Sequence, residues 1–168
     1  RTAANVTSTP KPYVSRALVT SATLIMGADE NVFYGSSIDL DKPKVMLASN
    51  AKSNASEIDL VYVYTFASDE DVLGTPSWAN ASGFSFVSGW STYNSTKFYK
   101  IPEAVFEQIS TKKQMEDLWQ ETLAIDPSVP VAKNNVIIAK TNKGTLALMK
   151  IVRHVPGATG QIEIKVAQ

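Results

Sequence analysis

The hydrophobic positions of this chain recur with a period of two over several stretches, which is typical of β-strands. The clearest stretch is 58–66, IDLVYVYTF, where both faces of an extended strand carry apolar side chains. A strand that is apolar on both faces belongs in the middle of a sheet that is covered on both sides. Residues 13–26 show a similar two-sided pattern and predict a second covered strand.

The C-terminal third reads as a meander of three strands at 135–141, 145–154 and 161–168. Between the first two strands, Asn-Lys-Gly forms a turn in which Gly144 can adopt a positive φ. The last strand alternates cleanly, so one of its faces should point inward. The side chains of this inward face are Ile162, Ile164 and Val166.

One segment, 111–125, follows the helical period instead. Thr111 and Gln114 have the spacing of a capping box at its start. The apolar stripe that we expect to be buried consists of Met115, Leu118, Trp119, Thr122 and Leu123. Pro127 and Pro130 follow, and proline does not continue a helix.

The segments between these elements are less regular. We expect a short strand at 32–34, an extended piece at 36–44, one or two helical turns at 47–57, and a loop at 67–82. The first residues, 1–12, are small, polar and proline-containing, which favours a flexible N-terminal tether. Residues 13–168 then form a single globular domain.

The predicted fold class is α+β, with an antiparallel-dominated sheet that carries 58–66 near its centre and the meander at one side. The helix 111–125 packs on one face of this sheet. A two-sheet β-sandwich is the alternative, because the same strand pattern fits both arrangements.

Composition removes several classes of function. The chain has 168 residues, 44% of them hydrophobic, with 16 basic and 16 acidic residues, so its net charge is zero. No basic stripe is present to follow phosphates, so we expect no nucleic-acid partner. There is no cysteine and a single histidine, His154, which excludes thiolate zinc sites, cysteine nucleophiles and two-histidine sites. We therefore predict no cofactor and no metal, and no apolar run is long enough for a transmembrane span.

The most unusual stretch is 83–99, GFSFVSGWSTYNSTKFY, where aromatic residues alternate with Ser, Thr, Gly and Asn. Aromatic rings stack on the apolar faces of sugars, and the polar neighbours could bond sugar hydroxyls. The candidate ligand-binding residues are Trp78, Trp90, Tyr93 and Asn94. The competing and favoured interpretation is that most of these rings form core, since large aromatics usually do. Trp78 and Trp90 are the expected exceptions, because they lie beside Gly and Pro in loops.

The acidic groups give weaker signals. Asp69-Glu70-Asp71 or the pair Asp39 and Asp41 could contribute to a Ca²⁺ site, but neither has the spacing of a known calcium loop, so solvated acidic turns are predicted. His154 is expected at the surface or in a turn. No spacing selects a catalytic pair of carboxylates, and no Gly-x-Ser-x-Gly motif occurs, so no catalytic residue is assigned.

Three stretches together resemble a known group of proteins: IDLVYVY at 58–64, the following loop with PSW and NSTKF, and NNVIIAKTNKGTLALMKIVRHVPGATGQIEIKVAQ at 134–168. They are similar to a family of secreted or lipid-anchored proteins of unknown function from Bacteroidetes-type bacteria. The resemblance implies a Gram-negative protein that is either secreted or anchored at the outer membrane or in the periplasm; in the anchored case, a lipid anchor is expected upstream of Arg1.

The expected function is therefore a non-enzymatic cell-envelope or secreted domain with a binding or assembly role. Its partner would be a glycan bound through the loop aromatics, or another envelope protein. The alternatives are a carboxylate-dependent glycan hydrolase and a purely structural subunit of a surface complex.

Overall fold

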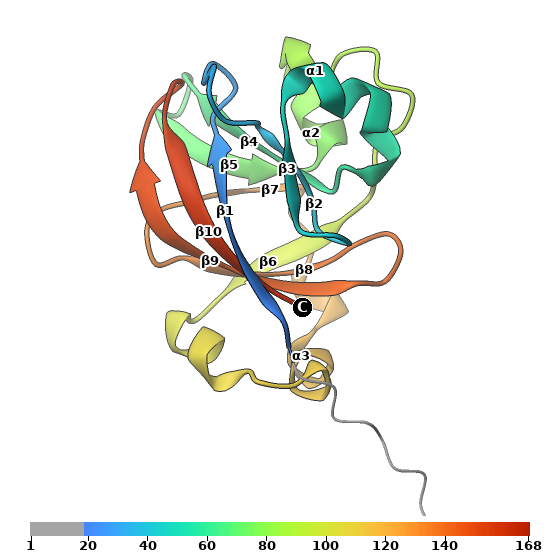
Figure 1. The fold of residues 1–168 in the computed structure, drawn as a ribbon, viewed down its shortest axis with the longest axis vertical. Coiled ribbons are helices and arrows are strands. Elements are labelled where there is room, and N and C mark those ends of the chain that lie inside the picture. The colour runs from blue at the N-terminus through green and yellow to red at the C-terminus, as the bar shows by residue number, and fades with distance from the viewer. Residues whose placement is uncertain (1–18) are drawn as a thin grey trace, which may run out of the picture.

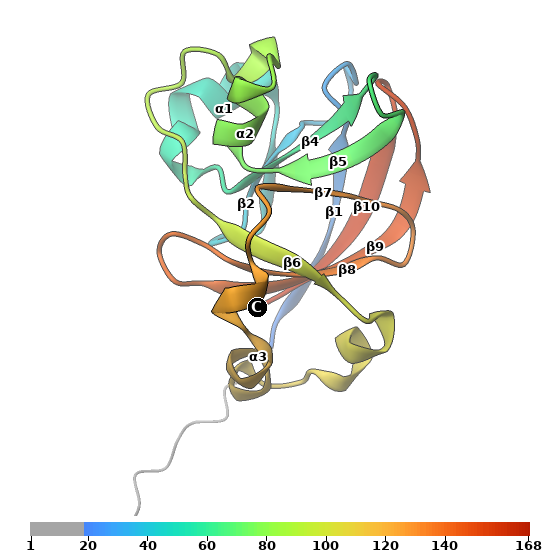
Figure 2. The ribbon, with the colours of Figure 1, turned by 180° about the vertical axis from the view of Figure 1, so that it is seen from behind.

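A computed structural model describes residues 19–168 and arranges them in two antiparallel five-stranded sheets that pack face to face (Figures 1 and 2). The predicted tether 1–12 and the first part of the predicted strand 13–26 lie outside the described residues. The antiparallel architecture is confirmed, but a single sheet is wrong, and the two-sheet alternative fits. The alternation along each strand identifies covered faces, and it does not identify which strands pair.

The first sheet contains the C-terminal meander and has the order β1-β10-β9-β8-β6. Its strands are β1 (Ser21–Gly27), β6 (Lys97–Ile101), β8 (Val136–Lys140), β9 (Leu146–Val155) and β10 (Gln161–Ala167). The β8–β9 turn is as predicted, with Gly144 at φ 90°. The inward residues predicted for the last strand are fully buried.

The second sheet has the order β3-β2-β4-β5-β7. Its strands are β2 (Ser37–Asp39), β3 (Lys44–Met46), β4 (Leu60–Thr65), β5 (Glu70–Gly74) and β7 (Ser128–Pro130). The strand predicted from 58–66 is β4, and it occupies the middle of this sheet. Its position explains why it is apolar on both faces, because each face is covered by another layer.

Three hydrophobic clusters hold these layers together. The largest lies between the sheets and includes Tyr62, Phe98 and Ile164. A second covers the outer face of the second sheet, where Val61 and Val63 of β4 meet short helical segments. These segments are α1 (Ala48–Ala51), η1 (Lys52–Glu57), α2 (Pro76–Ala81) and the 3-10 turn η2 (Ser85–Val87). The third cluster lies between the first sheet and the segments η3 (Glu103–Gln108) and α3 (Lys112–Leu118) at the lower end of Figure 1.

The predicted helix 111–125 is shorter than its sequence pattern indicates. The capping box is present, with Thr111 Oγ1 accepting from Gln114 N and Gln114 Oε1 accepting from Thr111 N. The helix ends at Leu118 because the hydroxyl of Tyr99 donates to the Leu118 carbonyl and accepts from the Gln120 N–H at 2.8 Å. Residues 121–123 form a separate 3-10 turn, η4 (Glu121–Leu123), and Leu123 is 49% exposed.

Two other expectations need correction. Residues 32–34 form no strand, because Asn31 Oδ1 accepts the N–H groups of Phe33 and Tyr34 and bends the chain. The region 67–82 is not a loop, since it contains β5 and α2. The helical turns expected at 47–57 are confirmed as α1 and η1. No helix in the range 19–168 is long and apolar enough to cross a membrane.

A buried polar group links the two sheets. His154 of β9 lies with Nε2 at 2.7 Å from Asp71 Oδ2 of β5, and the Tyr62 hydroxyl donates to Asp71 Oδ1 at 2.9 Å. Asp71 is 5% exposed, so the solvated acidic turn predicted for 69–71 is wrong at this residue. His154 is half-buried rather than free at the surface, because a buried carboxylate needs hydrogen-bond partners.

Replacing Tyr62 by Phe should destabilise the protein by about 1–3 kcal/mol, because a hydrogen bond to a buried charged group is lost. Burial and the neighbouring Asp71 raise the pKa of Tyr62, so its hydroxyl remains the donor at neutral pH. Urea unfolding at neutral pH would measure the change. Tyr34→Phe is the control, since Tyr34 is exposed and its hydroxyl bonds to none of the described residues. Equal midpoints for the two variants would contradict this account.

Candidate functional site

The aromatic residues of the excursion between β5 and β6 form a continuous row of rings on the outer face of the second sheet. Successive centroids along Trp78, Phe84, Phe86, Trp90 and Tyr93 are 6.0, 6.4, 6.5 and 6.4 Å apart. Most of these rings pack against the second hydrophobic cluster. The row is therefore mainly core, as the favoured interpretation of the sequence predicted.

Two of the four predicted ligand-binding residues are corrected by burial. Trp90 is 5% exposed and its indole N–H donates to the Phe86 carbonyl, so it offers no face to a ligand. Asn94 is 4% exposed, and its amide donates to the carbonyls of Ser56 and Ile58 at 2.9 Å. Asn94 thus anchors the end of the excursion to the sheet.

Trp78 and Tyr93 are half-buried and lie at opposite ends of the row. Tyr93 stacks on Trp90 and donates its hydroxyl to the Val87 carbonyl. It lines a hollow of about 310 Å³ together with Asn94, Ser77, Ser95 and the segment 124–127. The predicted residues therefore do not form one site, because α2 contributes Ser77 to this hollow and Trp78 to another.

Trp78 lines a groove of about 360 Å³ between the end of β4 and the end of α2. Its lining residues are Tyr64, Thr65, Phe66, Ala67, Trp78, Ser82, Gly83 and Phe84, and we call it the aromatic groove. Phe66 is 70% exposed and meets Tyr64 edge to face, with centroids 4.9 Å apart. Aromatic side chains in a concave surface are the usual lining of a ligand site.

Local sequence fixes Trp78 in this groove. Thr75 caps α2 by accepting from the Trp78 N–H at 3.1 Å, and Pro76 occupies the first turn of the helix. The indole lies directly over Gly74 of β5, where an added Cβ would be 2.3 Å from Trp78 Cε3. A glycine at this position therefore allows the ring to lie close to the strand.

Sequence reasoning missed Tyr64 and Phe66 because their alternation with Leu60 and Tyr62 placed both on a core face. The strand ends at Thr65, and the following turn, with Asp69 at φ 55°, directs Phe66 to solvent. The run Ala-Ser-Asp-Glu directly after Phe66 is the sequence signal that could have indicated this ending.

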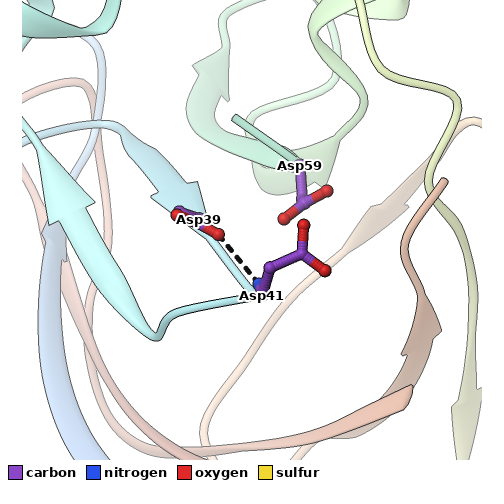
Figure 3. Close-up of side chains that lie close together, drawn as sticks. All are labelled: Asp39, Asp41 and Asp59. Atoms are coloured by element: carbon purple, nitrogen blue, oxygen red, sulfur yellow. Dashed lines mark hydrogen bonds between the residues drawn. The ribbon is translucent and has the colours of Figure 1, made fainter. Parts of the chain in front are cut away.

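A cluster of three carboxylates lies where β2 ends and β4 begins (Figure 3). One oxygen each of Asp39, Asp41 and Asp59 lie within 4.8 Å of one another, a spacing at which carboxylates could hold a cation. The carboxylate of Asp41 points toward that of Asp59, and Asp39 accepts the Asp41 N–H at 2.8 Å. Asp39 is 3% exposed, so it is not part of a solvated turn.

The chain itself balances much of this negative charge. Lys143 Nζ lies 2.9 Å from Asp41 Oδ2, and the Thr141 hydroxyl donates to Asp41 Oδ1 at 2.8 Å. Asp59, with no exposed surface, accepts the Leu40 N–H and the Thr96 hydroxyl. These bonds connect both sheets and the excursion, which favours a structural role for the cluster.

Burial dominates the titration of this cluster. It raises the pKa of Asp59 to about 6 and raises the pKa of Asp39. Burial also acts to raise the pKa of Asp41, but hydrogen bonds from Thr145, Lys143 and Thr141 hold that pKa below its usual value.

Comparisons with known proteins give no assignment: no family model matches the chain, and neither the curated proteins nor the solved structures contain a significant match.

Gly74→Ala should displace the Trp78 indole and destabilise the protein by about 1–3 kcal/mol, as overpacking does. The measurement is a double-mutant cycle by urea unfolding. If the cost comes from the contact with the indole, Gly74→Ala should be nearly neutral in a Trp78→Ala background. Additive costs would show that Gly74 is required for another reason.

Asp59→Asn should reduce the pH dependence of stability. Since the folded-state pKa of Asp59 is raised from 3.8 to about 6, the folded state holds the proton more tightly, and stability falls as pH rises from about 4 to about 6.5. The loss is on the order of 3 kcal/mol. Asp39 contributes in the same direction and Asp41 in the opposite one.

Unfolding free energies of the wild type and Asp59→Asn should be measured between these pH values. The variant should gain stability relative to the wild type as pH rises, because it does not bury a charge. A constant difference across the range would mean that Asp59 ionises as freely in the folded chain as in the unfolded chain.

Proposed function

We propose that this protein is a non-enzymatic cell-envelope or secreted domain that binds a glycan in the aromatic groove. The observation that carries the proposal is the groove itself. Four aromatic side chains from two separate segments, Tyr64, Phe66, Trp78 and Phe84, line one hollow at the surface. Burying an exposed ring such as Phe66 under a ligand would recover apolar area that now faces water.

Sugar chemistry suits this lining. The carbon–hydrogen face of a pyranose can pack on an aromatic ring, while its hydroxyls need polar partners at the rim. The Ser82 hydroxyl and the Trp78 indole N–H belong to residues that line the groove, and neither forms a hydrogen bond with residues 19–168. These two donors are the proposed polar partners of a ligand.

An extended peptide is a poorer candidate for this groove. Peptides that bind along a sheet usually add a strand to a free edge. The groove lies beside β4, and β4 is paired on one side with β2 and on the other with β5. Recognition there has to come from side chains, which favours a ligand with its own rigid apolar faces.

The carboxylates support a binding role over the hydrolase alternative. The residues that line the aromatic groove include no Asp, Glu or His. Asp39 and Asp59 of the other carboxylate cluster are almost completely buried, whereas a glycosidase places its two carboxyl groups on either side of an accessible bond.

A role in assembly is the second candidate, and one surface favours it. Val32 and Phe33 are 81% and 83% exposed at the turn between β1 and β2, where Asn31 holds the backbone in place. An exposed aromatic side chain is typical of a protein contact.

The proposed compartment is supported by the resemblance of 58–64 and 134–168 to secreted or lipid-anchored proteins. The absence of a basic stripe supports the proposal that nucleic acid is not a partner.

The test is a titration with soluble oligosaccharides of glucose, xylose, mannose and N-acetylglucosamine, followed by calorimetry and Trp fluorescence. At least one series should bind, and Trp78→Ala and Phe66→Ala should each weaken binding about tenfold, since losing a stacking ring costs about 0.5–1.5 kcal/mol beyond its buried area.

Phe33→Ala is the matched control, because it removes an aromatic ring that is even more exposed than Phe66 and does not line the groove. Its affinity should equal that of the wild type. No heat and no fluorescence change with any series, or an equal loss in Phe33→Ala, would contradict glycan binding in the groove.

A further inference from the structure

Several carboxylates lie next to residues of the aromatic groove, and two of them, Asp69 and Glu70, belong to the β4–β5 hairpin. Asp29 Oδ1 accepts the Tyr64 N–H at 2.9 Å, and Asp69 accepts a hydrogen bond from the Tyr64 hydroxyl. Glu70 pairs directly with Thr65 across the hairpin. Tyr64 and Thr65 both line the groove, so these acidic groups lie within one residue or one hydrogen bond of it.

Two of these acidic groups, Asp69 and Glu70, are exposed, and neither forms a direct ion pair within the described part of the chain, although Lys100 lies close enough to Glu70 to interact with its charge. Asp71, in contrast, is buried against His154 and Tyr62. Lys100 and His154 line a separate hollow with Asp69–Asp71, and none of the residues that line the aromatic groove is Lys, Arg or His.

Aromatic faces and exposed carboxylates both favour a positively charged ligand. The face of an aromatic ring carries negative potential and attracts a cation, most strongly at Trp. The exposed carboxylates of Asp69, bonded to the Tyr64 hydroxyl, and of Glu70, paired with Thr65, lie next to residues of the groove and add a longer-range attraction that salt screens. A neutral ligand would use the rings alone and leave Asp69 and Glu70 without an ion-pair partner among residues 19–168.

We infer that the aromatic groove is selective for amine-bearing glycans, such as oligomers of a 2-amino sugar, over neutral glycans of the same linkage. This inference rests on the proposed function and names its ligand class. The sugar ring stacks on Trp78 and Phe66, and protonated amines of the same or the next residue lie toward Asp69 and Glu70.

The test compares two ligands of the same linkage and length that differ only at the amino group: the β-linked hexasaccharide of glucosamine, with charged amines, and its fully N-acetylated, neutral counterpart. Calorimetry at mildly acidic pH, where the free amines are protonated, should give about tenfold tighter binding of the amine form, as expected for two exposed ion pairs. Added NaCl should reduce this preference and leave the N-acetylated ligand little changed.

The double variant Asp69→Asn, Glu70→Gln should bind both ligands equally, at the affinity that the wild type shows for the N-acetylated form. Asn suits position 69 because it tolerates the positive φ found there and can still accept from the Tyr64 hydroxyl. The matched control is Glu116→Gln, Asp117→Asn, which makes the same change in net charge on α3, at the lower end of Figure 1. This control should keep the full preference.

The outcomes separate the inference from the proposed function. If both hexasaccharides bind equally to the wild type and lose affinity in Trp78→Ala, the groove binds glycans and the amine selectivity is wrong. If neither these ligands nor the neutral series bind, the proposed function itself fails. If a hexapeptide of lysine binds as tightly as the glucosamine oligomer, the groove recognises ammonium groups without the sugar, and the glycan assignment is overturned.

Discussion

The arrangement of the outer layer depends on a single buried carboxylate, that of Asp59. It has no exposed surface, and it accepts from the Leu40 N–H at 2.7 Å and from the Thr96 hydroxyl at 3.0 Å. These two bonds join the end of β2, the start of β4 and the end of the aromatic excursion at one point. A carboxylate in this position is costly to ionise, and its raised pKa is the expression of that cost. This cost is offset because hydrogen bonds to the same carboxylate position several segments that have no regular strand pairing.

The segment between β5 and β6 is anchored at both ends, and the aromatic groove lies near its first anchor. The excursion is held at its start by the bond from Thr75 N to the Pro127 carbonyl, and at its end by Asn94 and Thr96. Between these anchors, α2 has six residues and is too short to be stable alone. The rings therefore supply the buried area that a longer helix would otherwise provide. This outer layer of rings and short helices covers only part of the second sheet. The aromatic groove lies where the layer ends, beside the end of β4.

The sequence predicts those parts of the structure that depend on local pattern. The central position of β4 follows from its two apolar faces, and the meander follows from its alternation and from Gly144. Contacts between residues that are far apart in the sequence produce no such local pattern. Asp59 reads as an isolated polar residue between Ile58 and Leu60, and its neighbours in the cluster are about twenty residues away. The end of α3 depends on the hydroxyl of Tyr99, a strand residue that a helical period cannot reveal.

The different environments of Trp78 and Trp90 show how the same row of core aromatics contributes a half-buried ring to the candidate groove. Both were expected to be exposed, because both have Gly or Pro neighbours. Trp90 lies inside the row of rings, and its indole N–H is used by the Phe86 carbonyl. Trp78 lies at the end of the row, where no further ring covers it and no described residue accepts from its indole N–H.

The same packing that buries one indole therefore leaves the other half-buried, with an N–H that bonds to none of residues 19–168. Gly74 contributes to this result, because the indole can approach the strand this closely only where no Cβ is present. A ring held this way loses little conformational entropy when a ligand stacks on it. The proposed binding at this edge would then require no further adaptation of the fold, and the charge of the neighbouring hairpin would decide which ligand is preferred.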